Sequence, residues 1–129
     1  MQSRKITAVL ALVVAAAAVV LFIALNDSSD SNGAEDRSFD LEFADGKAVG
    51  GAQDISVTQD DHVTVTLHTD EPAELHIHGY ELSKEVDRGA TGSIKFTADA
   101  TGEFEVEAHP IAHGEEGDGV EIATLQVNP

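Results

Sequence analysis

The sequence predicts an all-β domain of seven to eight short strands, a sandwich or a barrel, preceded by one apolar helix. Three observations support this prediction. Apolar and polar residues alternate in short runs beyond residue 37, as they do in half-buried strands. Turn signals rich in Gly, Asp and Pro separate these runs, and none of the runs has helical periodicity. Residues 6–25, in contrast, form one unbroken apolar stretch.

The N-terminal stretch predicts a membrane anchor. Residues 1–5 include two basic side chains, and residues 6–25 then carry no charge. A helix of that length rises about 30 Å, the thickness of the hydrocarbon core of a bilayer. A cleaved secretory signal is the alternative, but the apolar run has no Ala-x-Ala pattern before Asn26. We predict an uncleaved transmembrane helix, with residues 1–5 in the cytoplasm and the rest of the chain on the extracytoplasmic side.

The remaining chain is divided by composition into a linker and a domain. Residues 26–37 contain no large apolar side chain, which predicts a flexible acidic linker. Residues 38–129 form the predicted β domain. All 24 acidic residues follow residue 25 and meet only five Lys or Arg there, so this part has a formal charge of −19. Such a surface repels nucleic acid, and it suits either solubility alone or docking of a basic envelope protein.

The first three predicted strands come before the histidine-rich stretch. Residues 38–43 alternate, with Phe39, Leu41 and Phe43 on one face, and Asp45-Gly46 then signals a tight turn. Residues 55–58 alternate again after a Gly-Gly breaker. Residues 62–69 follow, and their inward side chains are predicted to be Val63, Val65 and Leu67.

The later strands follow the same alternation. Residues 73–78, 93–97 and 103–109 are predicted strands, and residues 122–127 close the domain. In the third of these, Phe104, Val106 and Ala108 take one face, whereas Glu105, Glu107 and His109 take the other. The Gly-rich acidic stretch 113–119 is predicted to be a loop.

Two histidines lie one residue apart in the strand at residues 73–78. Because side chains alternate across a strand, His76 and His78 project from one face, and Leu75 and Ile77 project from the other. Imidazole is the commonest metal-ligating side chain and titrates near neutral pH. Gly79, which follows directly, predicts a turn or a bulge, and Tyr80 is expected to pack on the domain.

The order of these elements resembles that of cupredoxin-like domains, the sandwich of plastocyanin and its relatives. The resemblance covers residues 38–129 and depends most on Phe96-Thr97-Ala98-Asp99-Ala100-Thr101-Gly102-Glu103-Phe104 and on the Leu-x-Val-x-Pro end at residues 125–129. It implies a Greek-key β-sandwich. It also implies that His76 occupies the first metal-ligand position, at one pole of the sandwich, with His109 or His113 near the second.

The chain departs from this family at the metal site. Ala108 stands where the resemblance places the cysteine ligand, and the chain has no cysteine and no methionine beyond Met1. A thiolate is what sets the geometry of a blue-copper centre. The chain therefore resembles a branch of the family that lacks the blue-copper ligands, and the missing thiolate excludes blue-copper electron transfer.

The remaining candidates form a histidine site. Three imidazoles, or two with a carboxylate, suit Cu(II), Zn(II) or Fe(II), and the resemblance favours copper. The predicted metal-ligating residues are His76, His78, His109, His113 and Glu107.

Other readings of this cluster remain open. The histidines could form a metal-free polar pair with Glu74, Glu105 or Glu107 in an interaction module, or a pH-sensing cluster. A small metalloenzyme with an open coordination position is a further alternative. We expect no enzymatic activity, because so small a core predicts no apolar substrate pocket. His62 and His68 are expected on the solvated face of another strand.

Overall fold

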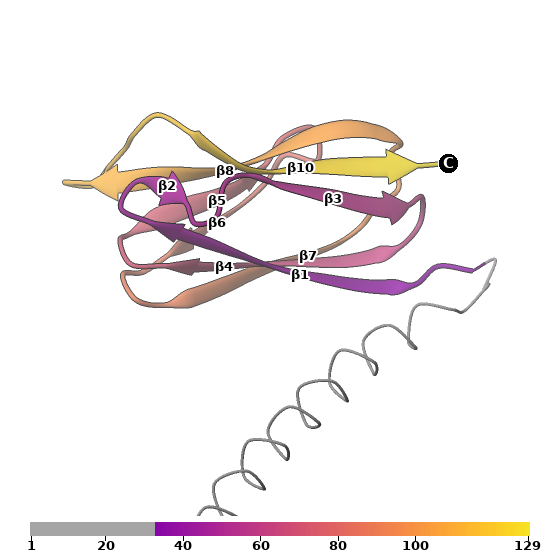
Figure 1. Ribbon diagram of the computed structural model, residues 1–129, viewed down its shortest axis with the longest axis horizontal. Coiled ribbons are helices and arrows are strands. Elements are labelled where there is room, and N and C mark those ends of the chain that lie inside the picture. The colour runs from indigo at the N-terminus through magenta and orange to yellow at the C-terminus, as the bar shows by residue number, and fades with distance from the viewer. Residues whose placement is uncertain (1–32) are drawn as a thin grey trace, which may run out of the picture. The chain divides into compact units, whose positions relative to one another are not determined.

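The computed structural model describes residues 33–129, which form two β-sheets packed face to face (Figure 1). The strands are β1 (Asp36–Ala44), β2 (Lys47–Ala48), β3 (Gln53–Thr58), β4 (His62–Thr69), β5 (Ala73–Ile77), β6 (Leu82–Val86), β7 (Thr91–Thr97), β8 (Gly102–Ala112), β9 (Glu115–Glu116) and β10 (Val120–Asn128). The predicted helix at residues 6–25 lies outside the described residues. Within residues 33–129, no helix has the length and apolar character needed to cross a membrane.

Each sheet mixes parallel and antiparallel neighbours. The smaller sheet has the order β2-β1-β4-β7, and β1 runs parallel to β4. The larger sheet has the order β3-β10-β8-β5-β6, with β9 paired to β8 and with β3 parallel to β10. The prediction of an all-β sandwich is thus confirmed. In this order β5 lies beside β8, although the two strands are separated in the chain by β6 and β7.

The core lies between the sheets and consists of the side chains that alternation placed inward. Leu41 and Phe43 of β1, Leu75 of β5 and Val106 of β8 are at most 1% exposed. Burial of one such aliphatic or aromatic side chain stabilises the fold by about 1.5–3 kcal/mol. The predicted faces of these strands are therefore confirmed, and this fixes which side chains of β5 and β8 point away from the core.

The strands differ from the prediction in three places. β6 was not predicted, because it is an edge strand whose middle residues are exposed. β2 and β9 are pairs of residues too short to give an alternating pattern. In β10, Ile122 and Leu125 are both buried at an odd spacing, because the pairing with β8 shifts register between Glu121 and Ala123. A β-bulge of this kind turns two successive side chains to one face.

The first strand begins earlier than expected, at Asp36 rather than at residue 38. Asp61 holds this segment in place. Its carboxylate is buried and accepts hydrogen bonds from the backbone N–H groups of Glu35 and Thr58, each at 2.9 Å. Burial alone would raise the pKa of Asp61, but these two bonds and the nearby guanidinium of Arg37 lower it below its ordinary value. The start of β1 is therefore fastened to the turn that precedes β4.

Tyr80 packs on the domain as predicted. Its ring lies against Phe96 and Phe104, with centroids 4.9 and 4.8 Å away. Its hydroxyl donates a hydrogen bond to the carbonyl of Ala100 and accepts one from the N–H of the same residue. These contacts hold the chain that follows β5 against β7, β8 and the turn between them.

Candidate metal centre

The pairing of β5 with β8 brings the predicted site residues together. His76 lies directly opposite Glu107, and Glu74 lies opposite His109. Leu75 and Ala108, which pair between them, are both fully buried. Since successive side chains point to opposite faces of a sheet, His76, Glu107 and His109 must lie on its outer face.

The resemblance implies a site at one pole of the sandwich, and the structure shows on which face of the larger sheet the histidines lie. Strand alternation decides the matter: Ala108, which stands where the resemblance places the cysteine, points into the core, and His109 beside it points outward. The histidines therefore gather on the outer surface of the larger sheet.

His78 joins the cluster although it lies just beyond the end of β5. Its backbone N–H donates a 3.0 Å hydrogen bond to the carbonyl of Glu105, which continues the ladder by one residue. Gly79 then turns the chain with a φ of 84°, as predicted. A Cβ at this residue would lie 2.3 Å from the ring of Phe104, so the turn requires glycine for space as well as for conformation.

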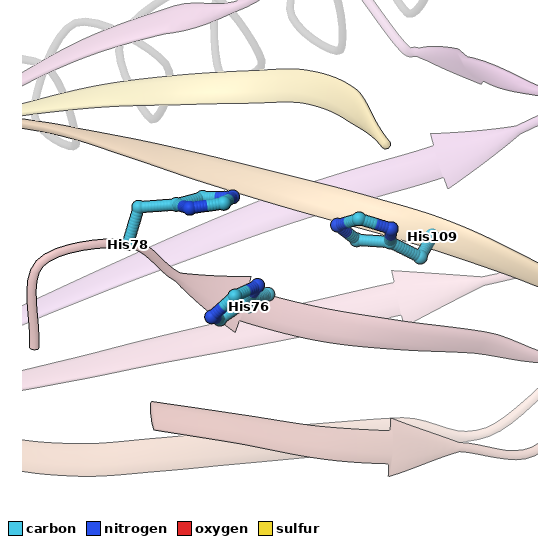
Figure 2. Close-up of side chains that lie close together, drawn as sticks. All are labelled: His76, His78 and His109. Atoms are coloured by element: carbon cyan, nitrogen blue, oxygen red, sulfur yellow. The ribbon is translucent and has the colours of Figure 1, made fainter. Parts of the chain in front are cut away.

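Three imidazole rings, one from β5, one from the residue just after it and one from β8, lie close together (Figure 2). One ring nitrogen from each of His76, His78 and His109 lies within 4.8 Å of the other two. The ring centroids of His76 and His78 are 4.1 Å apart, and that of His109 is 5.9 Å from that of His76. The side chain of His109 is 16% exposed and that of His78 is 40% exposed, so the cluster is partly shielded on the β8 side and open at the end of β5.

Glu107 lies among the imidazoles. Its Oε2 atom is 2.8 Å from Nε2 of His78 and 2.9 Å from Nε2 of His109. The hydrogen bond to Glu107 is the main reason that the pKa of His78 is raised above its ordinary value. The same bond lowers the pKa of Glu107. Glu107 is therefore ionised at neutral pH and supplies a negative charge inside the cluster.

The loop between β9 and β10 completes the site on the side of His109. Nδ1 of His109 lies 3.2 Å from the carbonyl oxygen of Gly117 and 2.9 Å from a carboxylate oxygen of Glu116. A Cβ on Gly119 would lie 2.2 Å from Oε2 of Glu107 and 2.8 Å from the ring of His109. Sequence reasoning treated residues 113–119 only as a loop. The three glycines in this stretch were the signal that its backbone could pass close to other residues.

The other histidines lie apart from this cluster. His113 is exposed in the turn between β8 and β9, at a φ of 56°, and it is not one of the three grouped histidines. His62 and His68 lie on the outward face of β4 in the other sheet, as expected. Nδ1 of His68 lies 2.9 Å from the hydroxyl of Thr91, so this ring has a local partner.

The pair formed by His78 and Glu107 predicts a pH dependence of stability. A raised histidine pKa adds stability that is complete below its ordinary value of 6.5 and is lost as the pH rises through the raised pKa. A lowered glutamate pKa adds stability that is complete above its ordinary value of 4.5 and is lost as the pH falls through the lowered pKa. We expect the free energy of unfolding of wild type minus that of His78→Gln, measured in urea without metal, to be greatest between these two values. A difference that is constant from pH 4 to pH 9 would contradict this coupling.

The donor set of this surface is made of imidazole nitrogens and one carboxylate. Neutral imidazole offers one lone pair to a metal and is the commonest metal ligand in proteins. Nε2 of His76 lies 3.7 Å from a carboxylate oxygen of Glu81, which is exposed. With no cysteine in the chain, the residues present fit a nitrogen- and oxygen-ligated metal rather than a thiolate-bound one.

Comparison with known proteins supports the fold. No protein-family model matches the chain, and no curated protein matches its sequence. A chain from the cryo-EM structure of a heme-copper terminal oxidase dimer is similar with a TM-score of 0.52 at 16% identity, over 98% of this chain and 100% of that one. The NMR structure of a copper binding protein in its apo form has a TM-score of 0.52 at 11% identity, over 78% of this chain and 93% of that one.

A larger solved protein contains a similar domain. The blue copper oxidase from Nitrosomonas europaea has a TM-score of 0.58 at 22% identity, over 73% of this chain and 39% of that one. The chain thus spans about two-fifths of that protein's length, and at such identities the likeness concerns the fold alone. Residues 33–129 therefore have a cupredoxin-like fold, and they carry a cluster of three histidines that is compatible with copper binding.

Proposed function

We propose that this protein binds one divalent copper ion through His76, His78 and His109. The observation that carries the proposal is the approach of three ring nitrogens to within 4.8 Å of one another on two paired strands. The pairing of β5 with β8, continued by one residue to His78, fixes the relative positions of these three residues on the sheet. The acidic surface around them attracts cations and favours their capture.

The donor chemistry supports copper in its divalent state. Imidazole suits Cu(II) and Zn(II), whereas soft sulfur ligands select Cu(I), and residues 33–129 contain neither cysteine nor methionine. The similar solved structures are described as copper proteins. Metal binding or metal handling is the role we assign, because electron transfer of the blue-copper kind requires a thiolate.

We further propose that the domain is non-catalytic and is tethered outside the cytoplasmic membrane by residues 6–25. The apolar length of that segment supports the tether. Two surface hollows among residues 33–129 are lined by residues of β1, β4 and β7 and by the loops next to them, and neither includes a histidine of the cluster.

The test uses two variants of the full chain, each with three histidines replaced. His76, His78 and His109 are replaced together by alanine in one variant, and His62, His68 and His113 are replaced together in the other. We expect wild type and the second variant to bind one Cu(II) per chain in competition with a chelator, and the first variant to lose that binding. Absence of binding by wild type, or equal binding by the two variants, would refute the function.

A metal-free interaction module is the second candidate, and one observation favours it. The hydrogen bond from His78 to Glu107 satisfies part of the cluster without an ion. Val49 is the one exposed large apolar side chain within residues 33–129, so a partner would recognise the charge of this surface rather than an apolar patch. This candidate would be supported if the protein bound no copper and bound a basic envelope protein in a salt-sensitive way.

A further inference from the structure

The carboxylate of Glu107 occupies the space between two of the three imidazoles. Its Oε2 atom approaches Nε2 of His78 to 2.8 Å and Nε2 of His109 to 2.9 Å. The side chain is 18% exposed, and the register of β5 with β8 places it directly opposite His76. One anionic oxygen thus lies beside the nitrogen donors, on the rigid part of the sheet.

The surroundings of His109 determine which of its nitrogens carries the hydrogen. Nδ1 faces the carbonyl oxygen of Gly117 at 3.2 Å and a carboxylate oxygen of Glu116 at 2.9 Å. Both groups are acceptors only, so Nδ1 must be the donor. In the neutral ring, Nε2 then carries a lone pair directed away from the loop.

This assignment brings two electron-rich atoms together. Nε2 of His109 is buried and has no hydrogen-bond partner among the described residues, although Oε2 of Glu107 lies 2.9 Å away. An Nε2–H group would be expected to point at the carboxylate, and this pair lacks that alignment. A lone pair and an anionic oxygen at this distance repel each other unless a proton or a metal ion lies between them.

The separations match those of neighbouring ligands on one metal ion. Two donors about 2.05 Å from an ion lie about 2.9 Å apart when they subtend a right angle and about 3.3 Å apart in a tetrahedron. The two distances from Oε2, 2.8 and 2.9 Å, agree with the right angle, and in the absence of an ion the first of them is the hydrogen bond to His78. Square-planar or tetragonal sites with nitrogen and oxygen donors are typical of Cu(II).

We infer that Glu107 is the fourth, anionic ligand of the site and gives it a preference for Cu(II) over Cu(I). This inference rests on the copper-binding function proposed above. A carboxylate oxygen is a hard ligand, and its charge stabilises the divalent ion more than the monovalent one. Reduction of the ion therefore weakens its binding. Gly119 is needed for this arrangement, because a side chain there would displace the carboxylate of Glu107.

The test compares Glu107→Gln with Glu105→Gln in the full chain. Glu105 lies two residues earlier in β8, exposed on the same outer face, so its substitution removes an equal charge close to His78 and leaves the contacts of the Glu107 carboxylate in place. We expect Glu107→Gln to raise the Kd for Cu(II) by about 100-fold, at or above the upper end of what loss of a positioning partner causes. The Kd for Cu(I), measured under reductant, should change far less, and Glu105→Gln should resemble wild type in both.

The EPR spectrum of the Cu(II) form distinguishes a ligand from a positioning residue. Glu107→Gln should shift g‖ and A‖, because these values report the atoms bound to the ion. Glu107→Asp, which keeps the charge but withdraws the oxygen, should shift them too and serves if the glutamine variant does not fold. If wild type binds Cu(II) and both Glu107 variants keep its spectrum, the inference is overturned while the proposed function stands. If wild type binds no copper, both fall.

Discussion

Replacing His109 with alanine is expected to lower the affinity for Cu(II) by about 100-fold or more, the largest loss among the three single histidine substitutions. The ring of His109 is the least exposed of the three, and its Nδ1 is held by Gly117 and Glu116. Nε2 is therefore oriented before the metal arrives. His78 lies beyond the end of β5 and is 40% exposed, so we expect His78→Ala to cost less. Chelator competition at pH 7.5 measures each Kd.

His113→Ala is the matched control for this substitution. It removes an exposed imidazole four residues further along the chain, outside the three-histidine group. Its Kd should equal that of wild type. An order of losses in which His78→Ala exceeds His109→Ala, or a loss in His113→Ala, would contradict the assignment of the ligands.

Replacing Asp61 with alanine is expected to lower the free energy of unfolding by about 3 kcal/mol, because it leaves two backbone N–H groups and one guanidinium without their buried acceptor. Asp61 is 2% exposed, and both of its oxygens accept backbone hydrogen bonds at 2.9 Å. Nε of Arg37 lies 3.5 Å from the same carboxylate. Equilibrium unfolding in urea at pH 7, with the full chain, measures this loss.

Asp54→Ala supplies the comparison, since this aspartate is exposed in β3. Its substitution should change stability by less than about 0.5 kcal/mol. The pKa of Asp61 is lowered, so its contribution is complete above the ordinary aspartate pKa and is lost as the pH falls through the lowered one. The two variants should therefore converge in acid. Equal stabilities at pH 7 would show that Asp61 does not fasten β1.

Much of the fold follows from side-chain alternation. The inward positions of Leu75 and Ala108 and the outward positions of His76 and His109 were each predicted from a local pattern, and the structure confirms them. Such predictions succeed because the burial of one face is a property of each strand by itself. The turn at Gly79 was predictable for the same reason, since glycine accepts a positive φ.

The positions of the strands relative to one another could not be predicted from side-chain alternation. The opposition of His76 and Glu107 depends on the register between β5 and β8, which are separated by two further strands in the chain. No local pattern encodes such a register. The pole position came from the family resemblance, whereas the outer face follows from strand alternation, which turns His109 away from the core.

The residues that contact His109 from the loop before β10 could not be predicted from the sequence either. The contacts of Gly117 and Glu116 with Nδ1 of His109 require the loop before β10 to fold back toward β8. β9, a pair of residues, directs that return by pairing with the end of β8. Two-residue pairings have no periodicity to detect, so the loop was predictable only as a loop.

The central claim is that copper binds on the outer face of the larger sheet, and locating the metal tests it most directly. Crystals of the copper-loaded full chain, measured on both sides of the copper absorption edge, would show the ion as an anomalous difference peak. The account predicts one peak within about 2.0–2.1 Å of ring nitrogens of His76, His78 and His109. A peak between the two sheets, a peak at His62, His68 or His113, or no peak would contradict it.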